Sequence, residues 1–271
     1  MGETLQAIIL GIIQGLTEFL PISSDGHLML GKALLGLKDE ENPLIFEAVI
    51  HAATTLSIIV VFWRDIVEIV RDLFKFQWNE NTRFALLVLV SMIPAGIAGT
   101  LLKDQINQLH VYNTPNLILT GFMLALTGVL LWLSSRLHTD NRPLNGWKAF
   151  TIGFFQAAAM LPGLSRSGST VSSSLVLGVD RTQATRFSFL MVVPVIIGGT
   201  AIQLKDYFEQ APSAQNGMSS SAMIAGFVVA FIVGLFSCRW MIALIRNSKL
   251  DYFAIYCLIV GAVTIAVGLM Q

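Results

Sequence analysis

Long apolar stretches restrict what this chain can fold into more than any other feature of its sequence. A helix that crosses a bilayer needs about 20 mainly apolar residues. Six stretches approach this length, at 46–63, 84–102, 115–133, 187–204, 222–240 and 252–270. Charged residues follow several of them, as at Arg64-Asp65 and Lys103-Asp104, which is typical of the end of a span. The sequence therefore predicts six transmembrane helices.

The composition excludes a water-soluble domain. Hydrophobic residues make up 54% of the 271 positions and charged residues only 13%, whereas soluble domains carry about 25% charged residues. The 17 basic and 17 acidic side chains balance, so no bulk positive field favours nucleic acid. Cys238 and Cys257 lie in apolar stretches and are expected to pack as small hydrophobic side chains. We expect one integral membrane domain over residues 1–271 that binds no nucleic acid.

Two further apolar regions are each interrupted by a proline and a loop rich in serine and glycine. The first has apolar runs at 5–20 and 28–37 around the loop 21–27, and the second has runs at 147–161 and 171–179 around the loop 162–170. Their arms are too short to span, and irregular backbone at membrane depth needs protein or a water-filled cavity around it. Each region is therefore predicted to form a re-entrant helix–loop–helix hairpin, with a helix of the second hairpin beginning near Ser169.

These two regions repeat at an offset of 142 residues. Four pairs of identical residues align: Gly11 with Gly153, Gln14 with Gln156, Ser23 with Ser165, and Gly26 with Gly168. One copy takes in about residues 1–135 and the other about 147–271. Each copy holds one hairpin and three spans, an odd number, so the second copy must enter the membrane from the opposite face. The predicted fold class is an all-α polytopic membrane protein with six transmembrane helices and two re-entrant hairpins in an inverted-topology repeat.

Loop charges predict the orientation of this arrangement. Ten Lys and Arg residues fall in loops on one side of the six-span arrangement and four on the other. The richer side is expected to be cytoplasmic, which makes both termini external. The first hairpin then enters from outside and the second from the cytoplasm, so that their polar tips meet near the midplane, as broken helices do in inverted-repeat transporters.

The first hairpin carries the residue types of a catalytic site. Ionisable groups at membrane depth cost about 2.5 to 3.5 kcal/mol each on insertion scales, so they are candidates for function. The polar set of this hairpin is Gln14, Glu18, Ser23, Ser24, Asp25 and His27. Gln14 and Glu18 are four residues apart and share one helical face. Together the set contains a nucleophile, a base and possible metal ligands.

The second hairpin has no acidic residue near its tip and is typical of an anion site. Its candidate binding residues are Gly163, Ser165, Arg166, Ser167, Gly168 and Thr170. An arginine offers a planar fork of donors to phosphate oxygens, glycines let backbone amides approach, and a helix start points its positive end at the anion. Arg166 is favoured as a phosphate ligand, with an ion pair to Glu18 as the alternative. Glu47 and His51 either line the same cavity or lie at the membrane interface.

Both motifs resemble the undecaprenyl-diphosphate phosphatase family, bacterial membrane proteins associated with bacitracin resistance. The segments that carry the resemblance are QGLTEFLPISSDGH at 14–27 and LPGLSRSGST at 161–170, and the likeness extends over essentially the whole chain. The sequence departs from some members at Gln14, where a second glutamate is often found, and at Asp25, where Thr or Ser is common. Both variants belong to the range of the family.

The resemblance implies hydrolysis of undecaprenyl diphosphate, a C55 isoprenyl lipid, to the monophosphate carrier of peptidoglycan synthesis. It places this reaction on the outer face of the bacterial cytoplasmic membrane and implies a divalent cation, Mg2+ or Ca2+. Glu18, Ser24, His27 and Arg166 would be the central residues. Candidate ligands of the cation are then Glu18, Asp25 and the neutral oxygen of Gln14.

Within this expectation, we predict that Ser24 attacks the terminal phosphorus with His27 as general base, while Glu18 orients His27 or binds the metal. His27 as the nucleophile is the open alternative. A secondary transporter or lipid flippase is the rival function, because inverted repeats with broken helices around a midplane site are a transporter design. The sequence leaves the oligomeric state open, a homodimer included.

Overall fold

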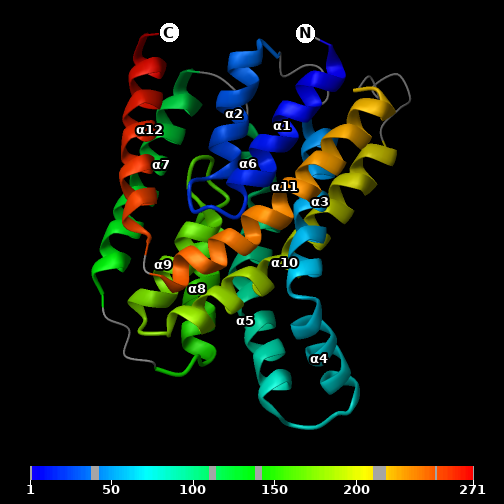
Figure 1. Cartoon of the computed structure of the whole chain (residues 1–271), viewed down its shortest axis with the longest axis vertical. Coiled ribbons are helices and arrows are strands. Elements are labelled where there is room, and N and C mark those ends of the chain that lie inside the picture. Colours follow the sequence, from blue (N-terminus) through cyan, green and yellow to red (C-terminus); the bar gives the residue numbers. More distant parts are fainter. Residues whose placement is uncertain are drawn as a thin grey trace.

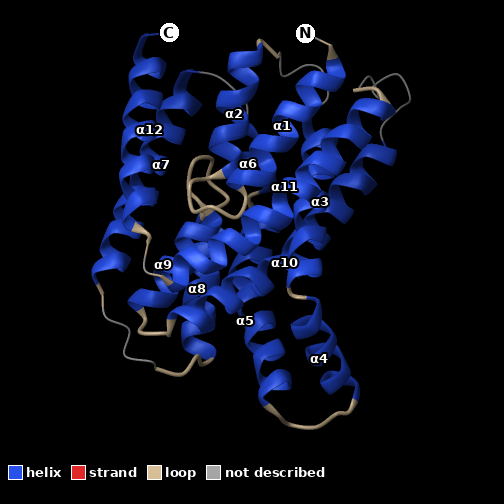
Figure 2. Ribbon diagram, in the orientation of Figure 1, coloured by secondary structure: helices blue, strands red, loops and turns tan. Residues whose placement is uncertain are grey.

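The computed structural model of the chain describes residues 2–37, 43–109, 114–137, 142–209, 218–247 and 249–270. All regular secondary structure within these residues is helical (Figure 2). The helices are α1 (Glu3–Thr17), α2 (Ser24–Leu35), α3 (Pro43–Val61), α4 (Trp63–Phe74), α5 (Glu80–Leu101), α6 (Lys103–Leu109), α7 (Thr114–Arg136), α8 (Gly146–Ala158), α9 (Arg166–Val176), α10 (Arg181–Glu209), α11 (Ser220–Arg246) and α12 (Asp251–Met270).

Long apolar helices form the frame of the molecule. Within the described residues, α5, α7, α10, α11 and α12 are each long and apolar enough to cross a membrane, and α3 with α4 gives a sixth candidate that bends by 78°. The six apolar stretches of the sequence fall in α3, α5, α7, α10, α11 and α12. Large apolar side chains such as Leu89 and Phe122 point outward, as a lipid-facing surface requires. The chain is therefore an all-α, multi-pass membrane protein.

Two short helix pairs, α1–α2 and α8–α9, form the interrupted regions. Their second helices begin earlier than the sequence predicted, α2 at Ser24 and α9 at Arg166. In both, the preceding serine is the N-cap: Ser23 Oγ accepts a hydrogen bond from the Gly26 amide at 3.3 Å, and Ser165 Oγ accepts one from the Gly168 amide at 3.1 Å. Such caps satisfy amides that the first turn leaves unpaired. The polar residues after each cap therefore lie in a first helical turn.

Each hairpin packs against a long helix through a glycine. α1 packs on α11 and α8 packs on α5. A Cβ atom on Gly11 would lie 2.6 Å from the carbonyl oxygen of Gly226, and one on Gly153 would lie 2.1 Å from that of Ser91. Any side chain at these positions would push the helices apart, so the two aligned glycines do the same work in both hairpins.

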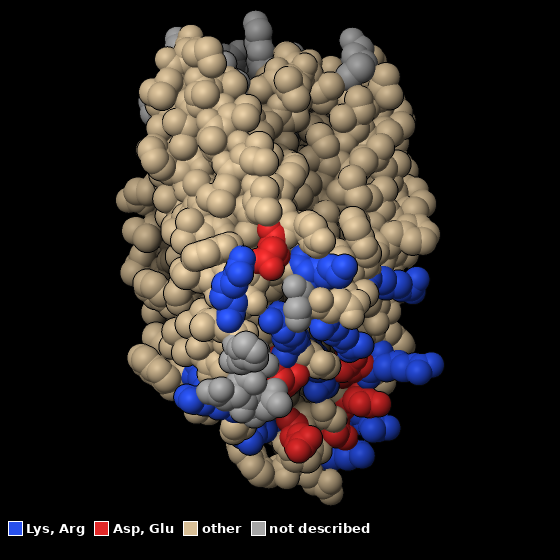
Figure 3. Space-filling model, turned by 60° about the vertical axis from the view of Figure 1, so that its left-hand side comes forward, with Lys and Arg blue, Asp and Glu red and all other residues tan. Residues whose placement is uncertain are grey.

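The long axis of the molecule separates two different ends. Both chain termini lie at one end and α4 lies at the other (Figure 1). On the face drawn in Figure 3, Lys, Arg, Asp and Glu side chains gather toward the α4 end. The loops of the two hairpins meet between these ends, where Ser167 Oγ of the second hairpin donates a 3.2 Å hydrogen bond to the carbonyl oxygen of Leu20 in the first.

Candidate active site

Glu18, immediately after α1, is the residue on which the polar groups of the first hairpin converge. Only 4% of its side-chain surface is exposed. Ser24 Oγ, on the first residue of α2, donates a 2.7 Å hydrogen bond to Glu18 Oε2. Gln14 Nε2, one helical turn before Glu18, donates a 3.0 Å hydrogen bond to the same oxygen. The carboxylate thus accepts directly from the candidate nucleophile.

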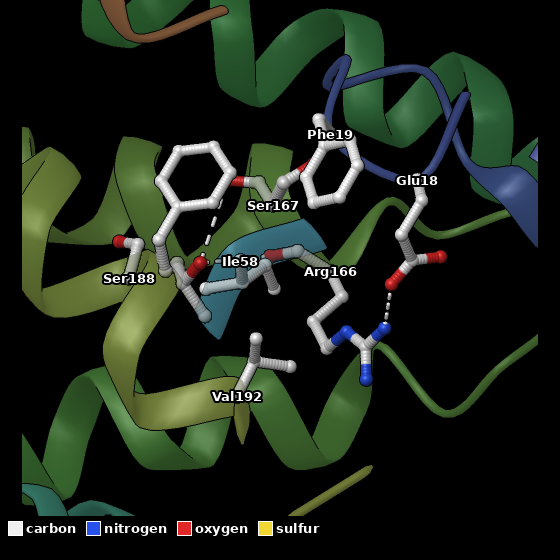
Figure 4. Close-up of a pocket in the computed structure, with 9 residues that line it drawn as sticks. Glu18, Phe19, Ile58, Arg166, Ser167, Ser188 and Val192 are labelled. Carbon is white, nitrogen blue, oxygen red and sulfur yellow. Dashed lines mark hydrogen bonds and ion pairs between the residues drawn. The ribbon is translucent and has the colours of Figure 1, made fainter. Parts of the chain in front are cut away.

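Arg166 reaches the same carboxylate from the second hairpin. Its guanidinium forms an ion pair with Glu18 Oε1 (Figure 4). The sequence favoured a phosphate as the partner of Arg166, but the structure shows the alternative, the ion pair with Glu18. Ser24 and Arg166 occupy the first residue of α2 and of α9, so the positive ends of two helix dipoles lie beside one carboxylate. This is the environment of an anion-binding site.

Other polar groups of the second hairpin hold its loop in place. The Ser165 amide donates a 3.0 Å hydrogen bond to Thr127 Oγ1 on α7, and Thr127 Oγ1 in turn donates to the carbonyl oxygen of Gly163 at 3.4 Å. Thr170 Oγ1 donates to the carbonyl oxygen of Arg166 at 2.9 Å. The structure therefore places Gly163, Ser165 and the Gly168 amide in the support of the loop, and not as free donors for an anion.

A narrow cavity lies beside the Glu18–Arg166 ion pair. Its polar lining comes from Glu18, Arg166, Ser167, Thr170 and Ser188 (Figure 4). Ser188 Oγ is buried and has no hydrogen-bond partner. Of the predicted binding residues, Arg166, Ser167 and Thr170 therefore face a common space.

His27 is turned away from Ser24. Its Nδ1 lies 2.7 Å from the carbonyl oxygen of Ser23, which can only accept, so Nδ1 carries the proton. In the neutral ring Nε2 is then an acceptor, and Tyr256 Oη lies 2.8 Å from it and donates. The two rings stack with an interplanar angle of 13°. The prediction of His27 as the base for Ser24 is not supported by this geometry, which puts Glu18 in that position.

His51 on α3 lies within the site, whereas Glu47 does not approach Glu18. His51 Nε2 is 3.7 Å from Glu18 Oε2 and 3.7 Å from Asp25 Oδ1. Glu47 instead forms an ion pair with Lys32 of α2. The two residues that the sequence treated together thus have different roles, one in the cavity and one in joining α2 to α3.

Comparison with known proteins agrees with the whole length of this arrangement. The model of the family described as bacitracin resistance protein BacA matches residues 7–263. The chain belongs to this family. An undecaprenyl-diphosphatase of Christiangramia forsetii is 48% identical over 99% of this chain and 100% of that protein. Undecaprenyl-diphosphatases of Bacteroides fragilis and Methanosphaera stadtmanae are 44% and 37% identical, each over 100% of its own length.

Oxygen donors that suit a hard divalent cation surround Glu18 in this BacA family member. Gln14 Oε1 is buried without a hydrogen-bond partner, and the carboxylate of Asp25 lies near His51 together with that of Glu18. Carboxylate and amide oxygens are the ligands that Mg2+ and Ca2+ prefer. Within the described residues, no three His, Cys, Asp or Glu side chains are already drawn together as a metal site. The donor chemistry fits a cation, which would have to draw the side chains inward.

Three site residues of this BacA family member were outside the motifs that the sequence pointed to. Tyr256 reaches His27 from α12, Thr127 supports the second loop from α7, and Ser188 lines the cavity from α10. Each lies in an apolar span with no charged neighbour to mark it. Only the packing of the spans around the hairpins shows their role.

Proposed function

We propose that this protein hydrolyses undecaprenyl diphosphate to undecaprenyl phosphate and inorganic phosphate. The observation that carries the proposal is the carboxylate of Glu18, which accepts from Ser24 Oγ and pairs with Arg166 between two helix N-termini. Such a place binds an anion and presents a hydroxyl to it. The relatives named undecaprenyl-diphosphatase cover the whole chain, and none of these names favours the rival function of a transporter or flippase.

The hydrogen bond from Ser24 to Glu18 suggests how the reaction begins. Glu18 takes the hydroxyl proton as Ser24 Oγ bonds to the terminal phosphorus, and the bond from that phosphorus to the bridging oxygen breaks. Undecaprenyl phosphate leaves, and water then hydrolyses the phosphoserine to release phosphate. Arg166 exchanges Glu18 for the phosphate oxygens, where it neutralises the charge that develops during transfer. Ser24 is the nucleophile of this proposal because both ring nitrogens of His27 are already engaged.

A divalent cation, Mg2+ or Ca2+, belongs to the proposal. Glu18 and Asp25, with the amide oxygen of Gln14, would hold it. When bound, it supplies positive charge to the diphosphate oxygens. Removal of the cation with EDTA is therefore expected to stop phosphate release.

We also propose the finer topology, in which two copies, about 1–135 and 147–271, are inverted in the membrane and each contributes one re-entrant hairpin. Support comes from the matching N-caps at Ser23 and Ser165 and from the reciprocal packing of α1 on α11 and α8 on α5. In this proposal the protein lies in the bacterial cytoplasmic membrane with both termini outside, and the site opens to the external face. A homodimer stays a prediction.

The test is phosphate release from undecaprenyl diphosphate by purified protein in detergent, with and without EDTA. We expect wild type to release phosphate only when the cation is present, and Arg166→Ala to lose this activity. Arg71→Ala is the matched control, because its side chain is 62% exposed on α4, and it should keep normal release. No release by folded wild type with Mg2+ or Ca2+ would contradict the proposal and make lipid translocation in liposomes the next assay.

A further inference from the structure

The orientation of the His51 ring is fixed by its own helix. Its Nδ1 lies 2.8 Å from the carbonyl oxygen of Glu47, one turn earlier on α3. A carbonyl oxygen can only accept a hydrogen bond, so Nδ1 carries the proton. In the neutral imidazole Nε2 then presents a lone pair. The same hydrogen bond is the usual way in which a protein orients a metal-binding histidine.

The lone pair of His51 faces two carboxylates. Nε2 is 3.7 Å from Glu18 Oε2 and 3.7 Å from Asp25 Oδ1. Both distances exceed the range of an N–H···O hydrogen bond, so a shared proton does not explain the arrangement. Donor atoms that share a divalent cation at about 2.1 to 2.5 Å each lie about 3 to 4 Å apart. The spacing of these three donors is therefore that of ligands around one ion.

A buried amide gives a second, independent sign of a ligand. Gln14 is fully buried, and its Oε1 has no hydrogen-bond partner. The Nε2 of the same amide donates to Glu18 Oε2 at 3.0 Å and to Thr54 Oγ1 at 3.4 Å. Thr54 follows His51 by three residues on α3, so this amide lies between Glu18 and the helix that carries His51. A buried carbonyl oxygen without a partner is costly unless it meets a cation or a donor.

We propose that His51 is a nitrogen ligand of the divalent cation, in a site completed by Glu18, Asp25 and the neutral oxygen of Gln14. This inference rests on the proposed function, whose cation it assigns to a mixed nitrogen and oxygen shell. Imidazole suits Mn2+ and other transition metals, whereas Mg2+ and Ca2+ prefer oxygen alone. The site is therefore expected to bind Mn2+ more tightly than Mg2+ or Ca2+.

The ion pair between Lys32 and Glu47 supports this assignment. It joins α2, which carries Asp25, to α3, which carries His51. The backbone of Glu47 also holds His51 Nδ1. One residue thus sets both the ring orientation of His51 and the distance between the two helices that supply ligands.

Electron spin-echo spectroscopy of bound Mn2+ tests the proposal, because a directly bound imidazole nitrogen modulates the echo. We expect nitrogen modulation in wild type and none in His51→Gln. The affinity of His51→Gln for Mn2+ should fall about tenfold or more, and its affinity for Ca2+ by less than about threefold. His27→Gln is the matched control and should keep the modulation, because the nitrogens of His27 are engaged by Ser23 and Tyr256. His51→Asp, which restores an oxygen ligand, should bind Mn2+ without modulation.

Three outcomes would overturn the assignment of His51: modulation that persists in His51→Gln, modulation lost in His27→Gln, or none in wild type saturated with Mn2+. Phosphate release is measured on the same samples to separate this inference from the proposed function. Release without nitrogen modulation overturns the ligand assignment alone. Nitrogen modulation without release under any cation overturns the proposed function and leaves His51 as a ligand.

Discussion

Glu18 keeps a negative charge at a place where water is largely excluded. A buried carboxylate is tolerated only when partners compensate for its lost hydration, and here Arg166, Ser24 and Gln14 do so. The same donors suit the oxygens of a diphosphate. Substrate binding is therefore best described as an exchange, in which phosphate oxygens take over Arg166 and the helix N-termini while Glu18 turns to Ser24 and the cation.

Replacement of Ser24 by alanine tests the nucleophile. Because its hydroxyl makes its hydrogen bond to Glu18, Ser24→Ala should lower kcat about a thousandfold or more and change KM little. Ser221→Ala, at the exposed start of α11, is the matched control and should behave as wild type. Initial rates of phosphate release across a substrate series give both constants. Nearly normal activity in Ser24→Ala would reject the serine mechanism and return His27 to consideration.

The hydroxyl of Tyr256 holds His27 in one tautomer. Tyr256→Phe keeps the stacked ring but removes the donor to Nε2, so it should lower kcat by about three- to tenfold, the worth of one ordinary hydrogen bond. Nitrogen NMR of labelled histidine should show the Nδ1–H tautomer of His27 in wild type and a mixed population in the variant. The same tautomer ratio in both proteins would contradict this role of Tyr256.

The sequence predicts the residues at Glu18 better than it predicts their partners. Gln14, Glu18, Ser24 and Arg166 were expected to meet, and they do. The motif spacing could not show that Glu18, and not His27, receives the hydroxyl of Ser24. That depends on which way the His27 ring turns, and the ring turns toward Tyr256, a residue 229 positions away.

At the scale of single elements, the loop before α9 depends on Gly163. Its φ angle is +93°, and a Cβ atom there would lie 2.2 Å from the carbonyl oxygen of Thr120. Gly163→Ala should therefore lower the free energy of unfolding by about 2 kcal/mol or more. Gly96→Ala, in α5 with no atom within 4 Å of its Cβ position, should change it by less than about 0.5 kcal/mol. Thermal unfolding in detergent measures both, and equal midpoints for the two variants would contradict the prediction.

The charged helix α4, which continues beyond span α3, is joined to α5 by Asp72. Asn81 Nδ2 donates a 2.8 Å hydrogen bond to Asp72 Oδ2, and this bond together with Lys75 and Arg71 lowers the pKa of the Asp72 carboxyl. A lowered pKa in the folded state stabilises it above the pKa of the unfolded chain, and this contribution is lost as pH falls through the folded value.

Asp72→Asn should therefore make stability less dependent on pH on the acid side. Urea unfolding in detergent between about pH 5 and pH 2, a window set by the ordinary pKa of aspartate, should show a smaller decrease for the variant than for wild type. Asp104→Asn, at an exposed acid of α6, should follow wild type. An acid-side slope that Asp72→Asn leaves unchanged would show that this pair does not couple α4 to α5.

Helix existence was easier to predict than helix boundaries. The six spans follow from apolar length, which the bilayer fixes, and the structure confirms them. The start of α9 was expected near Ser169 and lies at Arg166. Apolar periodicity is a poor guide there, because Ser165 begins the helix through a side-chain cap within a run of polar residues.

At the scale of the whole molecule, the two copies pair across each other. α1 of the first copy packs on α11 of the second, α8 of the second packs on α5 of the first, and α7 packs on α12. Neither copy can therefore bury its hairpin alone. The offset of 142 residues indicated the repeat, but this exchange of partners depends on contacts between segments far apart in the chain.

Accessibility of introduced cysteines tests the inverted topology. Trp78 between α4 and α5 and Ser220 at the start of α11 are exposed, and α5, α7 and α10 separate them. Three crossings put the two positions on opposite sides only if the α8–α9 hairpin returns to the side that it entered from. Cys238 and Cys257 are buried and are replaced by alanine, with phosphate release as the check on folding. In intact cells a membrane-impermeant thiol reagent should label Ser220→Cys, whereas Trp78→Cys should react only after permeabilisation. Labelling of both from the same side would mean that the hairpin crosses the membrane, and labelling of Trp78→Cys alone would reverse the orientation that the loop charges predict.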